Sequence, residues 1–143
     1  MRIAVDAVGG DFVPRNPVEG ALEALAERPD LSIVLVGPED LISEELAKHE
    51  YDKERVIVQH APEIIDMHDS PAKAVKTKPN SSMHIGLGLH KKGVVNGFVS
   101  AGNTGALLAV STVILGRLEG VLRPTIASVF PTVNGFRMLV DRS

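Results

Sequence analysis

Apolar residues gather in short runs along the first 60 residues of the chain, and more polar segments separate these runs. The runs at 2–5, 31–36 and 56–60 are typical of strands in a parallel sheet that is covered on both faces. Between them lie segments with apolar residues at helical spacing, at about 16–27 and 38–49. Strands and helices that alternate with short connections predict a parallel sheet with right-handed crossovers.

The first predicted helix carries well-defined boundary signals. Asn16 is expected to cap it, with Pro17 at the first helical position and Glu19 completing a capping box. Its apolar positions recur at intervals of three and four residues, at Val18, Ala21, Leu22 and Leu25. Because glutamates line the opposite side, we expect a surface helix with one face on the sheet.

Residues 83–89 carry two competing signals. Their alternation of apolar residues with histidine and glycine is typical of a strand. The polar residues 80–82 in front and Gly93 behind two lysines are instead helix boundary signals. Because the alternating order also requires a crossover here, we predict a helix. It follows an irregular segment, 61–79, in which a short helix begins at residues 70–71.

The stretch from 95 to 116 predicts a strand that ends near Ser100, a glycine-rich turn and a helix over 106–115. Gly116 is a plausible stop for that helix. The helix is apolar on nearly all sides, so we expect it to be buried on more than one face. Two further strands, at about 125–130 and 136–140, are expected to form a hairpin.

The turn in this stretch has the residues of an anion-binding site. Gly102 and Gly105 allow a sharp turn and close approach of a ligand, and Asn103 and Thr104 suit a helix N-cap. Free N–H groups and the helix dipole favour an anion there. The alternative is a tight strand-to-helix connection with no ligand. A dinucleotide or P-loop site is disfavoured, because neither glycine pattern is present.

Charge along the chain supports a ligand. No aspartate or glutamate occurs from 70 to 118, whereas six lysines and arginines do, although the whole chain has a net charge of −3. A basic middle segment around an anion-friendly turn indicates an anionic ligand or an acidic partner.

Other features of the sequence exclude several classes of protein. The chain has no cysteine, which fits a cytoplasmic protein, and Asp6 comes too early for a signal peptide. Polar residues interrupt the uncharged stretch 93–116, so it is not expected to span a membrane. One tyrosine and no tryptophan leave few stacking platforms for nucleic acid. The acidic residues and histidine within 66–69 match no familiar metal-ligand spacing, so we expect a solvated loop and no metal site.

Four segments of the chain together resemble one family. They are MRIAVDAVGGD, SPAKAVKTKPNSSM, SAGNTGALLAVS and LGRLEGVLRP, in this order. The chain is similar over essentially its whole length to the bacterial phosphate acyltransferases (PlsX) of phospholipid synthesis. The resemblance implies a three-layer α/β/α Rossmann-like fold with a mostly parallel sheet, related to phosphotransacetylases and isopropylmalate dehydrogenases.

The resemblance also implies an activity and partners. The family moves a fatty acyl group from acyl carrier protein to inorganic phosphate, and a membrane acyltransferase uses the acyl phosphate to acylate glycerol 3-phosphate. Members are generally cytoplasmic homodimers with peripheral membrane association, and no cofactor is expected. Val8 and Thr77 depart from the family pattern, where methionine and a basic residue are usual. The family chain is far longer, so we expect that 1–143 is one α/β domain from its N-terminal portion.

These two lines of reasoning suggest a set of site residues. Asn103 and Thr104 are the candidate catalytic residues, because phosphate is itself a nucleophile and needs a cradle of donors. The candidate phosphate or substrate ligands are Asp6, Gly9, Gly10, Asp11, Ser81, Ser82, Ser100, Gly102 and Gly105. Candidates for docking the carrier protein, or for phosphate, are Lys73, Lys76 and Lys78.

Structural roles are the alternative for each of these residues, since the aspartates can cap turns and the serines can cap a helix. Two other functions stay open at this point: an inactive binding or dimerisation fragment of the enzyme, and a nucleotide-binding α/β domain.

Overall fold

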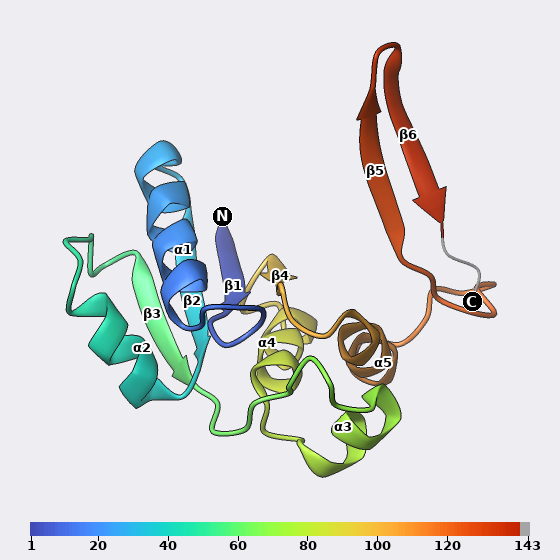
Figure 1. Cartoon of the computed structure of the whole chain (residues 1–143), viewed down its shortest axis with the longest axis horizontal. Helices are drawn as coiled ribbons and strands as arrows, with labels where there is room; N and C mark the ends of the chain where they lie inside the picture. The colour runs from blue at the N-terminus through green and yellow to red at the C-terminus, as the bar shows by residue number, and fades with distance from the viewer. Residues whose placement is uncertain (141–143) are drawn as a thin grey trace.

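A four-stranded parallel sheet is the centre of the computed structural model, which describes residues 1–140 (Figure 1). Its strand order is β3-β2-β1-β4, and every neighbouring pair is parallel. The strands are β1 (Arg2–Asp6), β2 (Ser32–Gly37), β3 (Val56–His60) and β4 (Gly97–Val99). The predicted α/β class with a parallel sheet is therefore confirmed.

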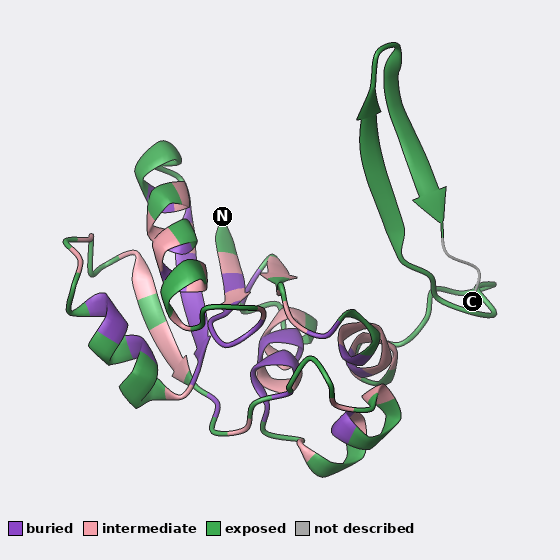
Figure 2. Ribbon diagram, in the orientation of Figure 1, coloured by how far each residue is buried: buried purple, intermediate pink, exposed green. Residues whose placement is uncertain are grey.

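Helices cover both faces of this sheet and complete three layers. Helices α1 (Arg15–Glu27) and α2 (Glu39–Leu46) pack on the face that includes Ile33 and Leu35. Helix α4 (Ser82–Lys91) packs on the other face, which includes Val34 and Val36. Strand β2 is thus buried on both sides, as its continuous apolar run predicts (Figure 2).

The start of α1 differs from the prediction. The helix begins at Arg15 with Pro14 at the N-cap, so Asn16 lies inside the first turn and the predicted capping box is wrong. The N–H of Asn16 donates to the carbonyl of Phe12, whose φ of 55° is left-handed. A backbone acceptor in the preceding loop therefore replaces the side-chain cap.

The prediction of a helix over 83–89 is confirmed by α4. The hydroxyl of Ser81 caps it by accepting from the N–H of His84 at 3.4 Å. Met83 and Leu87, four residues apart, are buried together against the neighbouring helices. Gly86 faces the ring of Phe98, which leaves no room for a larger residue.

Helices α3 (Pro71–Thr77) and α5 (Thr104–Ile114) join α4 in a second apolar cluster. In α5, Ala106 and Val110 are buried, but the side chain of Val113 is 65% exposed. The expectation that α5 is buried on more than one face is wrong for the described residues. Its outer face has apolar side chains that no described element covers.

Strands β5 (Ala127–Thr132) and β6 (Gly135–Val140) form the predicted antiparallel hairpin. It projects from the α/β body, and all its residues are exposed (Figure 2). Within residues 1–140 no helix has the length and apolar character needed to cross a bilayer.

Candidate functional site

The carboxyl ends of β1 and β4 lie side by side, and the two segments that leave them meet around Asp6. Asp6 is 2% exposed, and its carboxylate accepts hydrogen bonds from the Ser100 hydroxyl at 2.7 Å and the Val8 N–H at 3.2 Å. The Ser100 hydroxyl oxygen in turn accepts from the N–H of Gly102 at 3.1 Å. A buried carboxylate is therefore linked through one serine to the glycine-rich turn.

Burial is the largest influence on the protonation of Asp6. Removal from water raises the pKa of its carboxyl, because the charged form loses hydration. Hydrogen bonds from Ser82, Ser100 and Val8 act in the opposite direction and do not fully offset burial. Asp6 is thus a carboxylate whose proton affinity is higher than usual.

Glycine backbones pack tightly above this carboxylate. A Cβ atom on Gly9 would lie 2.8 Å from Cγ of Asp6 and 2.9 Å from Oγ of Ser100. A Cβ atom on Gly102 would lie 3.2 Å from Cα of Gly9, so the two turns touch through backbone alone. Gly10 has a φ of +101°, a conformation that favours glycine.

Asn103 holds the start of α5 to a distant loop. Its side-chain oxygen caps the helix by accepting from the N–H of Ala106 at 2.9 Å. Its amide nitrogen lies 3.2, 3.2 and 3.0 Å from the carbonyl oxygens of Asp66, Met67 and Asp69 and donates to them. Since Asn103 is buried and its polar atoms have protein partners, its evident role is to position the turn.

Two exposed residues follow Asn103. Thr104 and Gly105 open α5, and no acceptor among the described residues bonds to either backbone N–H. These two N–H groups lie at the positive end of the helix dipole, just after the turn that contacts Gly9 through Gly102. This arrangement can hold an anion.

The two predicted serines at the start of α4, its N-cap Ser81 and its first residue Ser82, are both buried. Ser81 has a structural role, because it caps the helix and its hydroxyl lies 2.8 Å from Nδ1 of His84. Ser82 is 2% exposed and lies within hydrogen-bonding reach of Asp6. Of the two serines, Ser82 is therefore the one that joins the Asp6 group.

The three predicted lysines do not form one cluster of free cations. Lys73 and Lys76 are exposed on α3. The ammonium of Lys78 donates to the carbonyl of Ile64 at 2.7 Å and forms an ion pair with the carboxylate of Asp69. Lys78 thus secures the loop that Asn103 also holds.

A cleft of about 780 Å³ opens beside these loops. Asp6, Gly9, Gly10 and Asp11 line one end of it, together with Ala101 from the turn after β4. Four of the predicted ligand residues therefore border a single cavity. These residues were expected to line a crevice at the strand ends, but local spacing does not indicate how far it extends, because its walls come from segments far apart in the chain.

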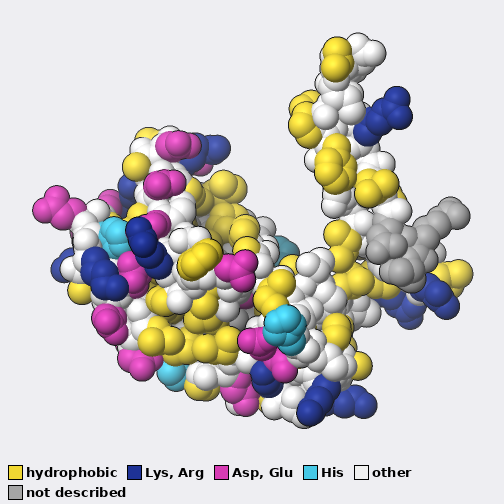
Figure 3. Space-filling view, viewed as in Figure 1, with side chains coloured by type: hydrophobic (Ala, Val, Ile, Leu, Met, Phe, Trp, Pro, Cys, Tyr) yellow, Lys and Arg dark blue, Asp and Glu magenta, His cyan; other side chains and the backbone are white. Residues whose placement is uncertain are grey.

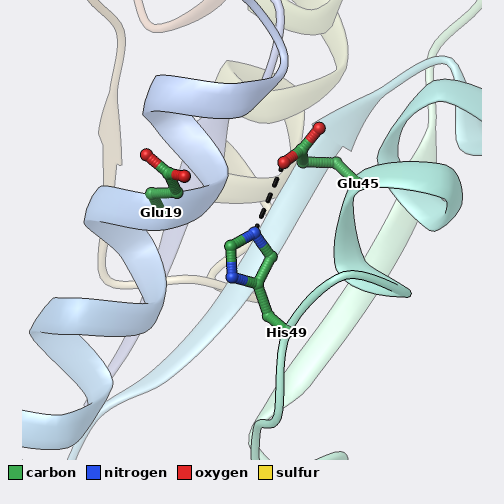
Figure 4. Close-up of side chains that lie close together, drawn as sticks. All are labelled: Glu19, Glu45 and His49. Carbon is green, nitrogen blue, oxygen red and sulfur yellow. Dashed lines mark hydrogen bonds and ion pairs between the residues drawn. The ribbon is translucent and has the colours of Figure 1, made fainter.

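Sequence reasoning also missed a charged cluster between α1 and α2. Figure 4 shows Glu19, Glu45 and His49, whose ligand atoms lie within 4.8 Å of one another. The Glu45 carboxylate pairs with Lys48 at 2.8 Å and with His49 at 3.3 Å, and Glu19 pairs with a neighbouring arginine. Each of these ion pairs joins residues three or four positions apart, within α1 or at the end of α2, so the charged groups already have partners on their own segment. The spacing of three and four residues from Glu45 to Lys48 and His49, at the end of α2, was its sequence signal.

The loop at 66–69 is held by internal hydrogen bonds. The N–H of His68 donates to the Asp66 carboxylate at 2.9 Å, and the N–H of Asp66 donates to the Asp69 carboxylate at 2.9 Å. These polar groups thus stabilise a loop, in keeping with the prediction for this segment.

Comparisons with known proteins agree on one family. A family model described as "Fatty acid synthesis protein" matches residues 1–143. The chain is 46% identical over 141 residues to a protein of Clostridium tetani named phosphate acyltransferase. It is 50% identical over 142 residues to a phosphate acyltransferase of Salinibacter ruber. Each alignment covers 98% or more of the chain but 42% of the relative, so the chain spans less than half the length of these relatives.

Proposed function

The chain belongs to the family of fatty acid synthesis proteins, and we propose that it is part of a phosphate acyltransferase acting on a fatty acyl thioester. A phosphate oxygen attacks the thioester carbonyl carbon, a C–O bond forms, the C–S bond breaks, and the thiol leaves with a proton. The proposed donor is acyl-acyl carrier protein. The acyl phosphate product then serves a membrane enzyme that acylates glycerol 3-phosphate.

This chemistry needs positioning more than an enzyme nucleophile. Phosphate supplies the attacking oxygen, so the protein must hold it, donate hydrogen bonds to the developing oxyanion, and exclude water. One observation carries the proposal: Thr104 and Gly105 begin α5, both residues are exposed, and no acceptor among the described residues bonds to either backbone N–H. We assign the phosphate to these amides.

Asp6 acts in this proposal through Ser100. Its carboxylate accepts a hydrogen bond from the Ser100 hydroxyl, and the lone pairs of the same serine oxygen accept from the N–H of Gly102. That pair of bonds fixes the turn from which α5 starts. Asp6 is therefore a positioning residue that lies buried beneath the backbone of Gly9.

Substitutions at Thr104 test the cradle directly. Thr104→Pro removes one backbone donor at a position where proline suits a helix start, and the ψ of 107° at Asn103 fits a residue before proline. Thr104→Ala removes the side chain and keeps the donor, so it is the matched control. Loss of one hydrogen bond to an anion, about 1.5–3 kcal/mol, predicts phosphate affinity about ten- to a hundredfold weaker in the proline variant.

Isothermal titration of the chain with inorganic phosphate gives the measurement, and circular dichroism checks that both variants fold. Equal affinities for the proline and alanine variants would contradict the cradle at α5.

Lys73 and Lys76 are the proposed contacts for the acidic carrier protein. Both are exposed, on a helix that packs against α5. Reversing both to glutamate is expected to raise KM for the acyl carrier protein more than KM for phosphate. Equal increases in the two KM values would argue against docking.

The other implications of the resemblance stay predictions. They are a homodimer, a cytoplasmic location with peripheral membrane contact, and the absence of a cofactor. Assaying the chain for acyl phosphate formation distinguishes an active domain from an inactive binding fragment.

A further inference from the structure

The cleft beside the candidate site runs well beyond the residues that we assign to phosphate. Its floor is β1, with Ile3 and Val5 on the face toward α1, and its walls are α1 and the edge strand β4. At one end are Gly9 and Gly10, and at the other are Met1 and Leu31. It therefore extends along the whole of β1, about 16 Å for five residues.

Small residues make room for the cleft on the wall that α1 forms. Gly20, Ala21 and Ala24 line it from α1, and a Cβ atom on Gly20 would meet nothing within 4 Å. On the opposite wall, Val99 pairs with Val5 across β1 and β4 and is 56% exposed. Between the ends of the cleft, the described residues that form the floor and walls are thus apolar, and no other side chain within 1–140 fills the space.

Among the described residues that line the cleft, charged groups occur only toward its two ends. Asp6 and Asp11 line the end near the candidate site, and Arg28 lines the far end. Figure 3 shows hydrophobic side chains at the surface beside α1, where this cleft lies. An apolar channel that starts at a polar reaction site suits a ligand with a polar head and a long hydrocarbon tail.

We propose that this cleft binds the hydrocarbon chain of a fatty acyl group, with the reacting carbonyl at the Gly9–Gly10 end. The inference rests on the proposed function, because it assigns the acyl part of the substrate to a place beside the phosphate. The volume of about 780 Å³ falls within the range of about 300–1,000 Å³ usual for ligand pockets. The continuity of the apolar wall with Gly9, Gly10 and Ala101 favours a chain attached to the reacting group over an unrelated ligand.

Saturated fatty acids of increasing length, each below its micellar concentration, are the probes for this test. Burial of each methylene is worth about 0.8 kcal/mol, so affinity for the chain is expected to rise up to about fourfold per added methylene. The rise should stop once the tail reaches the Met1 and Leu31 end. Methyl NMR signals of Ile3, Val5 and Val99 should shift on binding, whereas those of Val110 in the α5 cluster should not.

Gly20→Phe fills the cleft, and Glu23→Phe places the same ring on an exposed position of the same helix. Replacing a helix-interior glycine should not weaken α1, so loss of fatty acid binding would not reflect unfolding. We expect Gly20→Phe to reduce affinity at least tenfold and Glu23→Phe to leave it unchanged. Val99→Asp should also reduce affinity, whereas Ile57→Asp on exposed β3 should not.

Phosphate titration separates failure of this inference from failure of the proposed function. If phosphate binding depends on the Thr104 amide but fatty acids do not bind, the cleft has another occupant, such as a further protein segment, and this inference is overturned. Equal effects of Gly20→Phe and Glu23→Phe would overturn it as well. Length-dependent binding that Gly20→Phe abolishes would support it, whatever the result with phosphate.

Discussion

Gly9→Ala is the substitution that tests the Asp6 group most directly. The added Cβ would lie 2.8 Å from Cγ of Asp6 and 2.9 Å from Oγ of Ser100, and closer still to a carboxylate oxygen. Asp6 is buried below the glycine backbone and is fixed by hydrogen bonds from Ser100 and Val8. The added methyl group must therefore separate Asp6 from Ser100 or move the backbone.

The expected change in the free energy of unfolding is the balance of two overlapping penalties and one smaller gain. Forcing a methyl group into a packed site costs about 1–3 kcal/mol, and a hydrogen bond to a charged group is worth about 1.5–3 kcal/mol. These penalties overlap, since moving Asp6 relieves the clash while it breaks the bond. Alanine also restricts the unfolded chain, which returns about 0.4–1 kcal/mol. We expect a net loss of about 2 kcal/mol in the free energy of unfolding.

Urea denaturation followed by circular dichroism measures this loss, and Gly88→Ala in α4 is the control. A Cβ on Gly88 meets nothing within 4 Å, so alanine there should add about 0.5–1 kcal/mol through helix propensity. Phosphate affinity should fall in Gly9→Ala, because the turn before α5 loses its fixed position. A Gly9→Ala variant as stable as the parent chain would refute the packing on which the site depends.

Three further predictions concern the elements around the site. A Cβ atom on Gly86 would lie 3.1 Å from Cζ of Phe98, so Gly86→Ala must displace the phenyl ring. We expect the free energy of unfolding, measured by urea denaturation, to fall by about 1–3 kcal/mol. The hydrogen bond from Lys48 lowers the pKa of the Glu45 carboxyl below its usual value of 4.5. Glu45 therefore contributes its full stabilisation above pH 4.5, and this stabilisation is lost as pH falls through the lowered pKa. Glu45→Gln should flatten that part of a plot of stability against pH; an unchanged slope would exclude the ion pair as its source. Asn103→Asp keeps the oxygen that caps α5 but places a second acceptor oxygen, in place of the amide donor, against three carbonyls. It should lower the free energy of unfolding by about 1–3 kcal/mol and speed proteolysis of the loop at 66–69. Equal cleavage rates in the variant and the parent chain would count against this role of Asn103.

Local patterns predicted the sheet and most helices because each depends on neighbours within one turn or strand. The helix α4 is the instructive case, since alternation alone would have made it a strand. The boundary residues on either side correctly predicted a helix, and Ser81 caps its N-terminus. The start of α1 was wrong because a carbonyl from the preceding loop, at Phe12, took the place of the Asn16 side chain. That substitution depends on loop conformation, which the pattern of residue types does not specify.

The candidate site was predictable only where it depends on residues close together in the sequence. Glycine content pointed to the turn at 102–105, but the partners of Asn103 lie 34 to 37 residues away and no local spacing indicates them. The apolar character of α5 predicted burial, yet the described residues cover one face of it. Its hydrophobic pattern alone does not specify which element covers each face.

Asp6 and Ser100 show how a buried carboxyl group can position the turn of the candidate site. The two residues are 94 positions apart, and parallel pairing of β1 with β4 brings their strand ends together. Desolvation raises the pKa of Asp6, so ionised Asp6 reduces stability as pH rises through that raised value. The hydrogen bond from Ser100 offsets part of this penalty, and the same hydroxyl orients the N–H of Gly102.

Asp6→Asn separates these two effects. The amide carries no charge, so the desolvation penalty disappears and stability at neutral pH should rise. The amide is a weaker acceptor for the Ser100 hydroxyl, so the turn should be held less firmly and phosphate binding should weaken. A fall in both, or a rise in both, would contradict the separation of the two roles.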